Sequence, residues 1–403
     1  SGVIRCLGTP RREPIPEPPG IQMDFALTEE QQMYRRVARD FAERELAPQA
    51  AAVEERGEFP WENVRKLAEG DYFAMALAPQ YGGLGLGALT SVIVLEEICR
   101  CCCNTGAILQ GTMVCAHLLE RYGSDFVREK YLVPVAKGQA VAAFAATEPQ
   151  SGSDIMSHTT TAAKDGQDYV INGRKAFIGN ALEAAFVVVL ARTESEGGRA
   201  SFSWIAVDRD APGFSVGRRE QTMGLRALSV AEVSFKNVRV PQANLVGRQG
   251  EGLDIISSGL HWGNIFLMTE PIGVCQAALE ASVQFARQRR SFGVPIAQHQ
   301  AIQFMVSDMA TELEMCRLLA YKAAWLCDQG LPYDRYATML KIATPDMALR
   351  LTNMAIQIHG AAGYCRDFPV ERYMRQIRLY SIGEGTSEMH RQSLARLVFR
   401  DGV

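Results

Sequence analysis

Apolar residues recur every three or four positions from Thr28 to about Lys137, which is the spacing of amphipathic helices. The sequence predicts five helices in this part of the chain, over residues 28–46, 60–70, 89–101, 105–122 and 124–137. The stretch from Ala78 to Gly85 contains one proline and three glycines, so it is predicted to be a loop. These glycines follow a predicted helix and lack the spacing of a dinucleotide-binding motif, so no such motif is expected.

The pattern changes between about Ala142 and Val246, where short β-branched and aromatic runs alternate with Gly, Asn and Asp. Strands are predicted around residues 169–171, 186–190, 202–207 and 230–240. Several short strands of this kind favour a small antiparallel barrel or sandwich. The dipeptide Asn172-Gly173 is typical of a two-residue hairpin, so a turn is predicted there.

Helical spacing returns at Gly252 and continues to the end of the chain. The helices predicted here cover residues 252–288, 298–328, 333–359, 368–378 and 386–399. In the second of them, Ile302, Met305, Met309 and Leu313 form part of a continuous apolar stripe. Long helices joined by short polar turns favour a four-helix-type bundle.

The predicted fold class is therefore α+β, with a helical, a β and a second helical domain in that order. The boundaries are predicted as a disordered leader or expression remnant at 1–22, an N-terminal α-helical domain at 23–141, a middle antiparallel β-barrel domain at 142–246 and a C-terminal four-helix-type bundle at 247–403. The first segment holds five prolines and no apolar stretch typical of a signal peptide.

Composition excludes several classes of function. The chain has 403 residues, of which 47% are hydrophobic and 22% charged, as in ordinary globular proteins. A net charge of −3 gives no electrostatic reason to expect nucleic acid or an anionic membrane as a partner. No apolar run reaches the roughly 18 residues that a transmembrane helix needs.

Ten cysteines are present, and four of them, Cys99, Cys101, Cys102 and Cys103, lie within one predicted helical region. In a chain of this size, such usage is more typical of free thiols in a reducing compartment than of a disulfide framework. A zinc site built from this group with Cys115 and His117 is the alternative. Because the group lies in a helical pattern, no metal is expected.

The run from Ile382 to Arg391 contains one carboxylate, Glu384, between two glycines and just before a predicted helix. The glycines allow unusual backbone shapes and close approach of a ligand. Thr386 or Ser387 is predicted to cap the helix. A carboxylate on a turn fixed by such a helix is well placed to act as a catalytic base. The alternative is a solvated turn glutamate without a catalytic role.

Six short motifs occur in one order along the chain: Thr147–Asp154, Gly173–Asn180, Val240-Pro241 with Gly247–Gly252, Arg289–Gly293, Gln357–Tyr364 and the run around Glu384. In order and spacing they resemble the acyl-CoA dehydrogenase family, and the resemblance extends from about residue 24 to residue 400. It implies an FAD-dependent enzyme that removes hydrogens from the α and β carbons of an acyl thioester. In that chemistry Glu384 would take the α proton, and flavin N5 would accept the β hydrogen as hydride.

The resemblance also implies which residues hold FAD. One edge of the isoalloxazine would be lined by Phe144, Ala146, Thr147 and Ser153, and its other side by Phe177 and Gly179. The diphosphate and adenine portions, bound by a neighbouring subunit, would contact Arg289, Phe292, Gln300, Gln357, Gly360 and Ala361. Thr386 and Glu388 would lie near the adenosine end.

Four positions depart from the family pattern, and two of them belong to the expected substrate site. That site comprises Ser153, Asn264, Gly383 and Gly385. Gly383 replaces the aromatic residue that often precedes the base, and Asn264 replaces an arginine. At the flavin, Phe177 and Gly179 stand where tryptophan and threonine are common, and Gly179 cannot supply the hydroxyl that reaches flavin N5. These changes favour a specialised member acting on an unusual acyl-CoA or an acyl-carrier-protein thioester.

Two other functions are compatible with these residues. One is a flavin-dependent oxidase or monooxygenase on the same fold, and the other is a non-catalytic flavin- or thioester-binding protein. For the leading interpretation, the resemblance implies an electron-transfer flavoprotein as the electron acceptor. It also implies a homotetramer, or at least a dimer. The expected compartment is the cytoplasm rather than the mitochondrial matrix.

Overall fold

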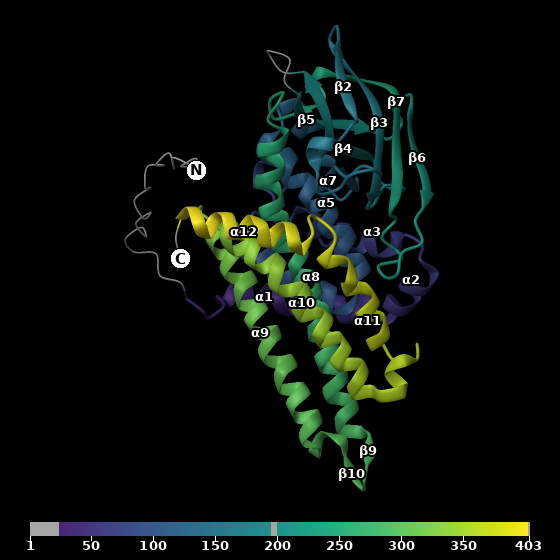
Figure 1. Ribbon diagram of the computed structural model, residues 1–403, viewed down its shortest axis with the longest axis vertical. Coiled ribbons are helices and arrows are strands. Elements are labelled where there is room, and N and C mark those ends of the chain that lie inside the picture. The colour runs from purple at the N-terminus through teal and green to yellow at the C-terminus, as the bar shows by residue number, and fades with distance from the viewer. Residues whose placement is uncertain (1–23, 195–199, 402–403) are drawn as a thin grey trace, which may run out of the picture.

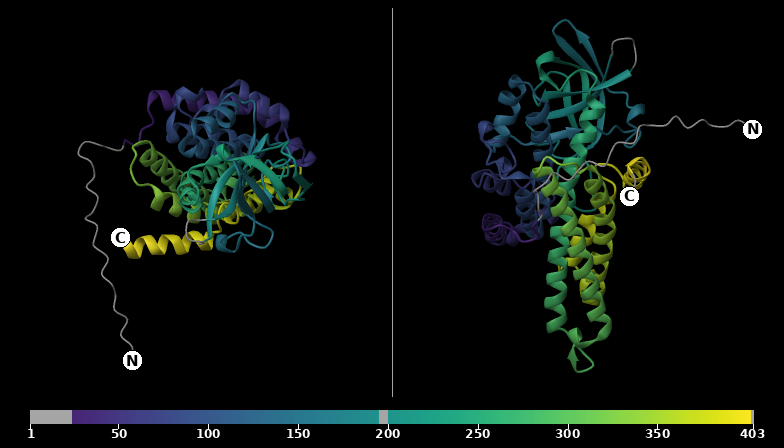
Figure 2. Two further views of the ribbon diagram at one scale, coloured as in Figure 1. Left: turned by 90° about the horizontal axis from the view of Figure 1, so that it is seen from above. Right: turned by 90° about the vertical axis from the view of Figure 1, so that its left-hand side faces the viewer.

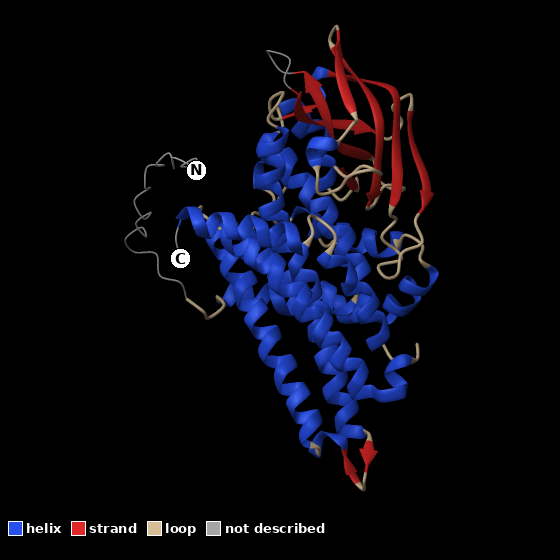
Figure 3. Ribbon diagram, viewed as in Figure 1, coloured by secondary structure: helices blue, strands red, loops and turns tan. Residues whose placement is uncertain are grey.

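The computed structural model describes residues 24–194 and 200–401, so the predicted leader at 1–22 lies outside the described residues (Figure 1). The helices fall into two groups along the chain, and the strands of the main sheet lie between them in sequence. In space the main sheet gathers at one end of the molecule, whereas a small hairpin stands at the opposite end (Figure 3). The predicted order of helical, β and helical regions is confirmed.

The N-terminal helices include four of the five predicted segments and one helix, over Ala50–Arg56, that the sequence did not predict. They are α1 (Glu29–Phe41), α2 (Ala50–Arg56), α3 (Trp61–Glu69), α4 (Gly87–Cys101) and α5 (Cys103–Tyr122). A capping box between Thr28 and Gln31 fixes the start of α1. The single helix predicted over 124–137 is wrong, because the segment divides into α6 (Asp125–Val127), a π-helical turn at 128–132 and α7 (Val133–Ala136). Pro134 has no N–H to continue the α-helical bonding there.

The main sheet contains eight strands: β1 (Ala142–Ala145), β2 (Thr161–Asp165), β3 (Asp168–Ile178), β4 (Phe186–Glu194), β5 (Ala200–Asp208), β6 (Phe214–Arg219), β7 (Ala231–Pro241) and β8 (Leu245–Val246). Their order is β6-β7-β3-β2-β4-β5-β8, and β1 pairs with β4 in parallel. The predicted closed antiparallel barrel is therefore not confirmed. The sheet is an open path, since β6 and β8 each pair on one side only among the described strands.

The hairpin predicted at Asn172-Gly173 is wrong. The chain turns earlier, between β2 and β3, and β3 continues through this dipeptide to Ile178. The pairing of β3 with β7 shifts register between Ile171 and Gly173, which marks an irregularity of the β-bulge type. Gly173 has φ 146°, and a Cβ there would lie 2.4 Å from Thr160 Oγ1. Close approach of Thr160, rather than a turn, therefore requires this glycine.

The C-terminal helices are α8 (Gly252–Gln288), α9 (Gln300–Asp328), α10 (Asp334–His359), α11 (Val370–Ile377) and α12 (Ser387–Asp401). The long helices α8, α9 and α10 run side by side away from the sheet (Figures 1 and 2). At their far end stands the hairpin of β9 (Arg290–Ser291) and β10 (Val294–Pro295). Of the predicted stripe on α9, Met309 and Leu313 are fully buried, which confirms the side of α9 that faces the core.

Two further expectations concern the whole chain. Every cysteine that the structure describes is a free thiol, as predicted. None of the helices in residues 24–194 and 200–401 has both the length and the apolar character needed to cross a membrane.

Candidate active site

Glu384 lies on the short turn between a 3₁₀ segment, Arg378–Ser381, and the start of α12. Its backbone has φ 53°, which is a left-handed conformation that a residue with a side chain rarely adopts. The following Gly385 has φ 91°, and a Cβ there would lie 2.7 Å from His390 Nε2. As predicted, Thr386 caps α12, since its hydroxyl accepts a hydrogen bond from the Met389 N–H at 3.3 Å. Strain of this kind persists only where the surrounding structure imposes it.

The carboxylate of Glu384 points into the protein. Its Oε1 accepts a 3.3 Å hydrogen bond from Gln110 Nε2 on α5. Its Oε2 is buried and accepts no hydrogen bond from any residue the structure describes. Burial raises the pKa of this carboxyl, while the hydrogen bond from Gln110 and the charge of Lys341 oppose the rise. The alternative of a solvated turn glutamate is therefore wrong, and one desolvated oxygen is left free to accept a proton.

Lys341 on α10 holds the turn that carries Glu384 in place. Its ammonium group is fully buried and donates to the carbonyl oxygens of Tyr380 at 2.6 Å and Gly385 at 2.9 Å. The two acceptors lie on either side of Glu384 in sequence, so one side chain holds both ends of the turn. His390 adds a third contact, because its Nε2 lies 3.2 Å from the Glu384 carbonyl oxygen. Sequence reasoning missed these supports.

The residues expected along the isoalloxazine come together where the segment that follows β1 meets the end of β3. Phe144 lies on β1, and Ala146 and Thr147 follow directly after it. The Ala176 N–H on β3 donates to the Thr147 carbonyl oxygen at 2.9 Å, which brings Phe177 and Gly179 beside this segment. Ser153 lies further along the same loop and is exposed.

A buried ion pair anchors the loop that carries Thr147. Lys175 Nζ on β3 donates to the Ala146 carbonyl oxygen at 2.7 Å and to Glu148 Oε1 at 2.9 Å. The backbone N–H groups of Thr159 and Thr160 also donate to the Glu148 carboxylate. Burial alone would raise the pKa of Glu148, but these hydrogen bonds outweigh it and lower the pKa. The segment before Glu148 is thereby held rigidly against the sheet.

Helix α5 connects these strand ends to Glu384. The Asn180 amide, next to Gly179, donates to the Ile108 carbonyl oxygen at 3.2 Å. Two residues further along α5, Gln110 bonds the Glu384 carboxylate. Positions 108 and 110 of one helix therefore contact both groups, which brings the expected flavin-contacting residues and Glu384 to the same part of α5.

The residues expected at the FAD diphosphate and adenine lie elsewhere. Arg289 ends α8 and Phe292 sits in the turn between β9 and β10, at the tip opposite the sheet (Figure 1). Phe292 is 94% exposed. The other members of this group are Gln300 at the start of α9, Gln357 near the end of α10, and Gly360 and Ala361 just after it. Phe285 of α8 and His359 of α10 stack with ring centroids 4.4 Å apart, which joins the two segments at this end. One chain thus does not bring this group to the flavin-edge residues.

The remaining expected residues surround Glu384. Glu388 is exposed on the first turn of α12. Asn264 on α8 is fully buried, and neither of its amide atoms has a hydrogen-bond partner within the described residues. The neighbouring Gly263 lies against the base, because a Cβ there would be 3.1 Å from Glu384 Oε2. Gly263 is a further residue that sequence reasoning missed, since no local pattern pairs it with Glu384.

The residues expected to contact the isoalloxazine include an exposed aromatic side chain against which a planar ring system could lie. Phe177 is held at φ 57° at the end of β3 and is 69% exposed, which is unusual for a large apolar side chain. An isoalloxazine lying against it would cover this ring, and the hydrogen-bonded segment of Ala146 and Thr147 lies alongside. The residues present therefore fit FAD. Gly179 has room for a side chain, since a Cβ would only touch Leu228 at 3.6 Å.

A buried carboxylate on the turn before α12 and an exposed aromatic side chain at the end of β3 both contact or adjoin residues bonded to α5, an arrangement that is compatible with a flavin-dependent oxidoreductase. The family models for acyl-CoA dehydrogenases match nearly the whole chain: the N-terminal domain at residues 28–139, the middle domain at 143–238 and the C-terminal domain at 250–399. The chain belongs to the acyl-CoA dehydrogenase family, whose members bind FAD.

Individual relatives agree with this assignment. A short-chain specific acyl-CoA dehydrogenase of Clostridium acetobutylicum is 37% identical over 379 residues, covering 94% of this chain and all of the relative. The solved butyryl-CoA dehydrogenase of Megasphaera elsdenii superposes with a TM-score of 0.91 at 32% identity, over 94% of this chain and 100% of the other. PigA bound to FAD and proline gives a TM-score of 0.90 at 29% identity, with coverage of 94% and 100%.

Proposed function

We propose that this protein oxidises an acyl thioester at its α and β carbons, with Glu384 as the base that takes the α proton. The observation that supports this most directly is the Glu384 carboxylate, which is buried, held by one hydrogen bond from Gln110 and left with one free oxygen. Burial raises its pKa towards the range in which a carboxylate is an effective base. Bound FAD supplies the acceptor for the β hydrogen and its electron pair.

The other residues of the site orient the reactants. Phe144, Ala146, Thr147, Ser153, Phe177 and Gly179 are proposed to contact the isoalloxazine. The backbone N–H of Glu384 is proposed to donate to the thioester oxygen, where negative charge develops as the α proton leaves. Gly383 leaves open the space beside the reacting carbons that an aromatic side chain would fill, which favours a branched or polar acyl group.

A second copy of the chain is proposed to complete each FAD site. The isoalloxazine group of residues lies where β1 and β3 end beside α5, whereas Arg289 adjoins the β9-β10 hairpin at the far tip of the long helices (Figure 1). The assembly proposed is a homotetramer, and a dimer is the smallest one that could join the two groups. A monomer in solution with one FAD per chain would contradict this.

The substrate proposed is an acyl-CoA or an acyl-carrier-protein thioester, and the electron acceptor an electron-transfer flavoprotein. The compartment proposed is the cytoplasm, supported by the bacterial relatives and by the free thiols. Retention of a buried Glu384 favours dehydrogenation over an oxidase, a monooxygenase or a binding protein. The domain boundaries at residues 23–141, 142–246 and 247–403 remain part of this proposal.

The test is anaerobic reduction of the flavin by acyl-CoA substrates. The wild-type protein should lose its yellow colour without oxygen, and Glu384→Gln should keep its FAD while the rate falls by about 10³-fold. A Glu69→Gln variant, which changes an exposed carboxylate at the end of α3 and outside the proposed site, should still bleach. Unchanged bleaching by Glu384→Gln would remove Glu384 from the mechanism, and a product formed only with oxygen would favour the oxidase.

A further inference from the structure

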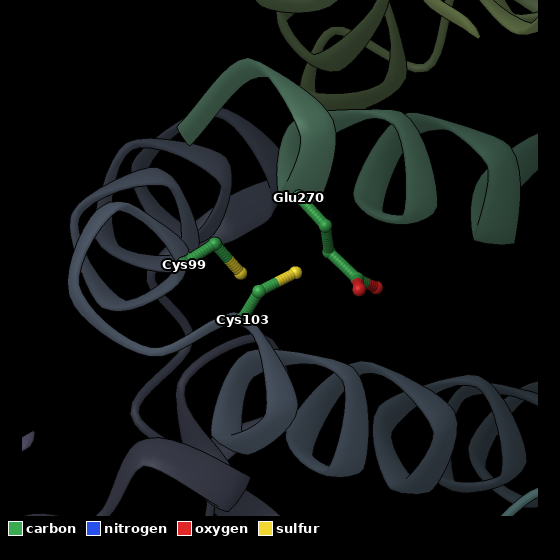
Figure 4. A group of neighbouring side chains, drawn as sticks. All are labelled: Cys99, Cys103 and Glu270. Carbon is green, nitrogen blue, oxygen red and sulfur yellow. The ribbon is translucent and has the colours of Figure 1, made fainter. Parts of the chain in front are cut away.

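A buried cluster of polar side chains lies near the candidate active site and has no role in the proposed reaction. Cys99 at the end of α4, Cys103 at the start of α5 and Glu270 on α8 point towards one another, with their sulfur and oxygen atoms within 4.8 Å (Figure 4). The hydroxyl of Tyr380 joins them, because it donates to Glu270 Oε2 at 2.6 Å and lies 3.2 Å from Cys103 Sγ. We refer to these four residues as the Glu270 cluster.

Glu270 carries an unused hydrogen-bonding atom. Its side chain is 0% exposed, and its Oε1 has no hydrogen-bond partner among the residues described. Burial raises the pKa of this carboxyl well above its usual range, and the neighbouring Cys103 thiol adds to the rise. A neutral carboxyl group of this kind offers both a donor and an acceptor. Buried polar atoms are rarely left unpaired in native proteins, so Oε1 requires a partner.

The Glu270 cluster repeats the geometry of the catalytic base on the same three segments. Gly263 on α8 and Gln110 on α5 contact the Glu384 carboxylate. Glu270 follows Gly263 by seven residues, and Cys103 precedes Gln110 by seven residues. Seven residues are almost two helical turns, so both pairs share one helix face and are separated by about 10 Å along the axis.

The segment before α12 also contributes one residue to each of the two sites. Tyr380 precedes Glu384 by four residues, and the two are connected by the turn that Lys341 holds. The facing surfaces of α5 and α8 therefore lead directly from the base to the Glu270 cluster.

The facing surfaces between the two sites are apolar and not fully closed. Ala107 on α5 and Leu267 on α8 occupy the intermediate positions, and each is 6% exposed. Phe266 and Met268, the neighbours of Leu267, are 0% exposed, and so is Ile108 beside Ala107. The two residues between Glu384 and the Glu270 cluster are thus buried but slightly less enclosed than those beside them.

We propose that the Glu270 cluster is the far end of the acyl site, and that Glu270 and Tyr380 bind an uncharged hydroxyl or amide group at the end of a short acyl chain. This inference rests on the proposed function, since it places the α carbon at Glu384. The thioester end lies at the base, the apolar middle of the chain passes Ala107 and Leu267, and the terminal polar group pairs with Glu270 Oε1. Substrates ending in a methyl group would leave that oxygen unpaired, which the site therefore selects against.

The experiment compares acyl-CoA thioesters of equal length that end in a hydroxyl or a methyl group, over a series of short chain lengths. For the wild-type holoenzyme, kcat/KM should favour the hydroxyl-ended thioester by at least about tenfold at the best length. Glu270→Met should abolish this preference, and Tyr380→Phe should weaken it. Glu280→Gln alters an exposed acid on the same helix and should keep the wild-type ratio.

Four other results would each contradict the inference and indicate a different role for Glu270 or for the whole site. If the wild-type enzyme had equal kcat/KM for both thioesters, Glu270 would not bind the substrate, and its free oxygen would be paired with a structural water. This result needs no variant. A preference for an ammonium-ended chain would show an ionised Glu270. Stoichiometric zinc in the purified protein, lost in Glu270→Gln, would make the cluster a metal site. Bleaching by neither thioester would overturn the proposed function itself, whereas bleaching by both at equal kcat/KM would overturn only the polar subsite.

Discussion

Gln110 and Glu384 are 274 residues apart in sequence, yet the Gln110 amide makes the only hydrogen bond that the Glu384 carboxylate receives from the described residues. A donor to a carboxylate stabilises its ionised form and so lowers its pKa. Burial acts in the opposite direction on the same carboxyl. Gln110 therefore limits how far burial can weaken the ionised base.

Replacing Gln110 by Leu should move the pH dependence of catalysis. Without the donor, the pKa of Glu384 rises further, so the base becomes ionised only at higher pH. A hydrogen bond to a charged group contributes about 1.5–3 kcal/mol, and we expect kcat at pH 7 to fall by about tenfold or more. The acid limb of the kcat–pH profile should move upward, and Gln139→Leu, at an exposed position, should leave it in place. An unmoved acid limb in Gln110→Leu would contradict this role.

Gly263→Ala should displace the base without unfolding the protein. The added methyl group would lie 3.1 Å from Glu384 Oε2 and 3.3 Å from Val114 Cγ2, so the carboxylate must shift by a few tenths of an ångström. Misplacement of a reacting group costs up to about 10²-fold in rate. We expect kcat to fall while FAD content and Tm stay near wild type. Gly217→Ala, where the new methyl group meets nothing closer than 3.4 Å, is the matched control.

The sequence predicts much of the fold because apolar spacing records which face of each long helix is buried. The span of α8 is predicted residue for residue, and the buried Met309 and Leu313 lie on the predicted stripe of α9. Glu384 is also a candidate from the sequence, since a carboxylate between glycines before a helix is a local pattern, although that pattern alone leaves a solvated turn glutamate as the alternative. Its partners Gln110, Gly263 and Lys341 are not predictable, because they meet Glu384 only through the packing of α5, α8 and α10.

Gly173 shows how a local pattern can mislead. Asn172-Gly173 has the composition of a hairpin turn, but the glycine lies inside β3. A glycine is needed at this position because Thr160 occupies the space that a side chain would fill. A Gly173→Ala variant would place a methyl group 2.4 Å from Thr160 Oγ1 at φ 146°. We expect it to lower the free energy of unfolding by about 2 kcal/mol or more, measured by urea denaturation. A Gly166→Ala change in the true turn, where nothing lies within 4 Å, should cost less.

Lys341 should give the folded protein a distinct dependence on pH. Burial lowers its pKa from 10.5 to about 8, although Glu384 and Glu388 oppose the change. Between these values the unfolded chain binds more protons than the folded one, so the free energy of unfolding rises with pH. The full difference corresponds to about 3 kcal/mol.

Urea denaturation from pH 7 to pH 10.5 would measure this effect. Lys341→Met should lose that part of the rise, whereas Lys164→Met, at an exposed position on β2, should keep it. Lys175, whose pKa is also lowered to about 8, is present in all three proteins and cancels from the comparison. Parallel stability curves for the wild-type protein and Lys341→Met would contradict the assignment.

The ion pair between Glu148 and Lys175 should be needed to hold the flavin-edge loop, and a double-mutant cycle can separate this from a general loss of stability. Both side chains are buried, so Lys175→Met leaves the Glu148 carboxylate without its cation and should destabilise the fold by about 3–5 kcal/mol. In Glu148→Gln/Lys175→Met no charge is left unpaired, and most of that stability should return. The Ala146 carbonyl oxygen still loses its donor in the double variant, because Lys175 Nζ holds it at 2.7 Å. We therefore expect the double variant to fold but to bind FAD more weakly than the wild-type protein, as measured by release of flavin fluorescence on dilution, and wild-type retention of FAD would show that the Ala146–Thr147 segment needs no such anchor.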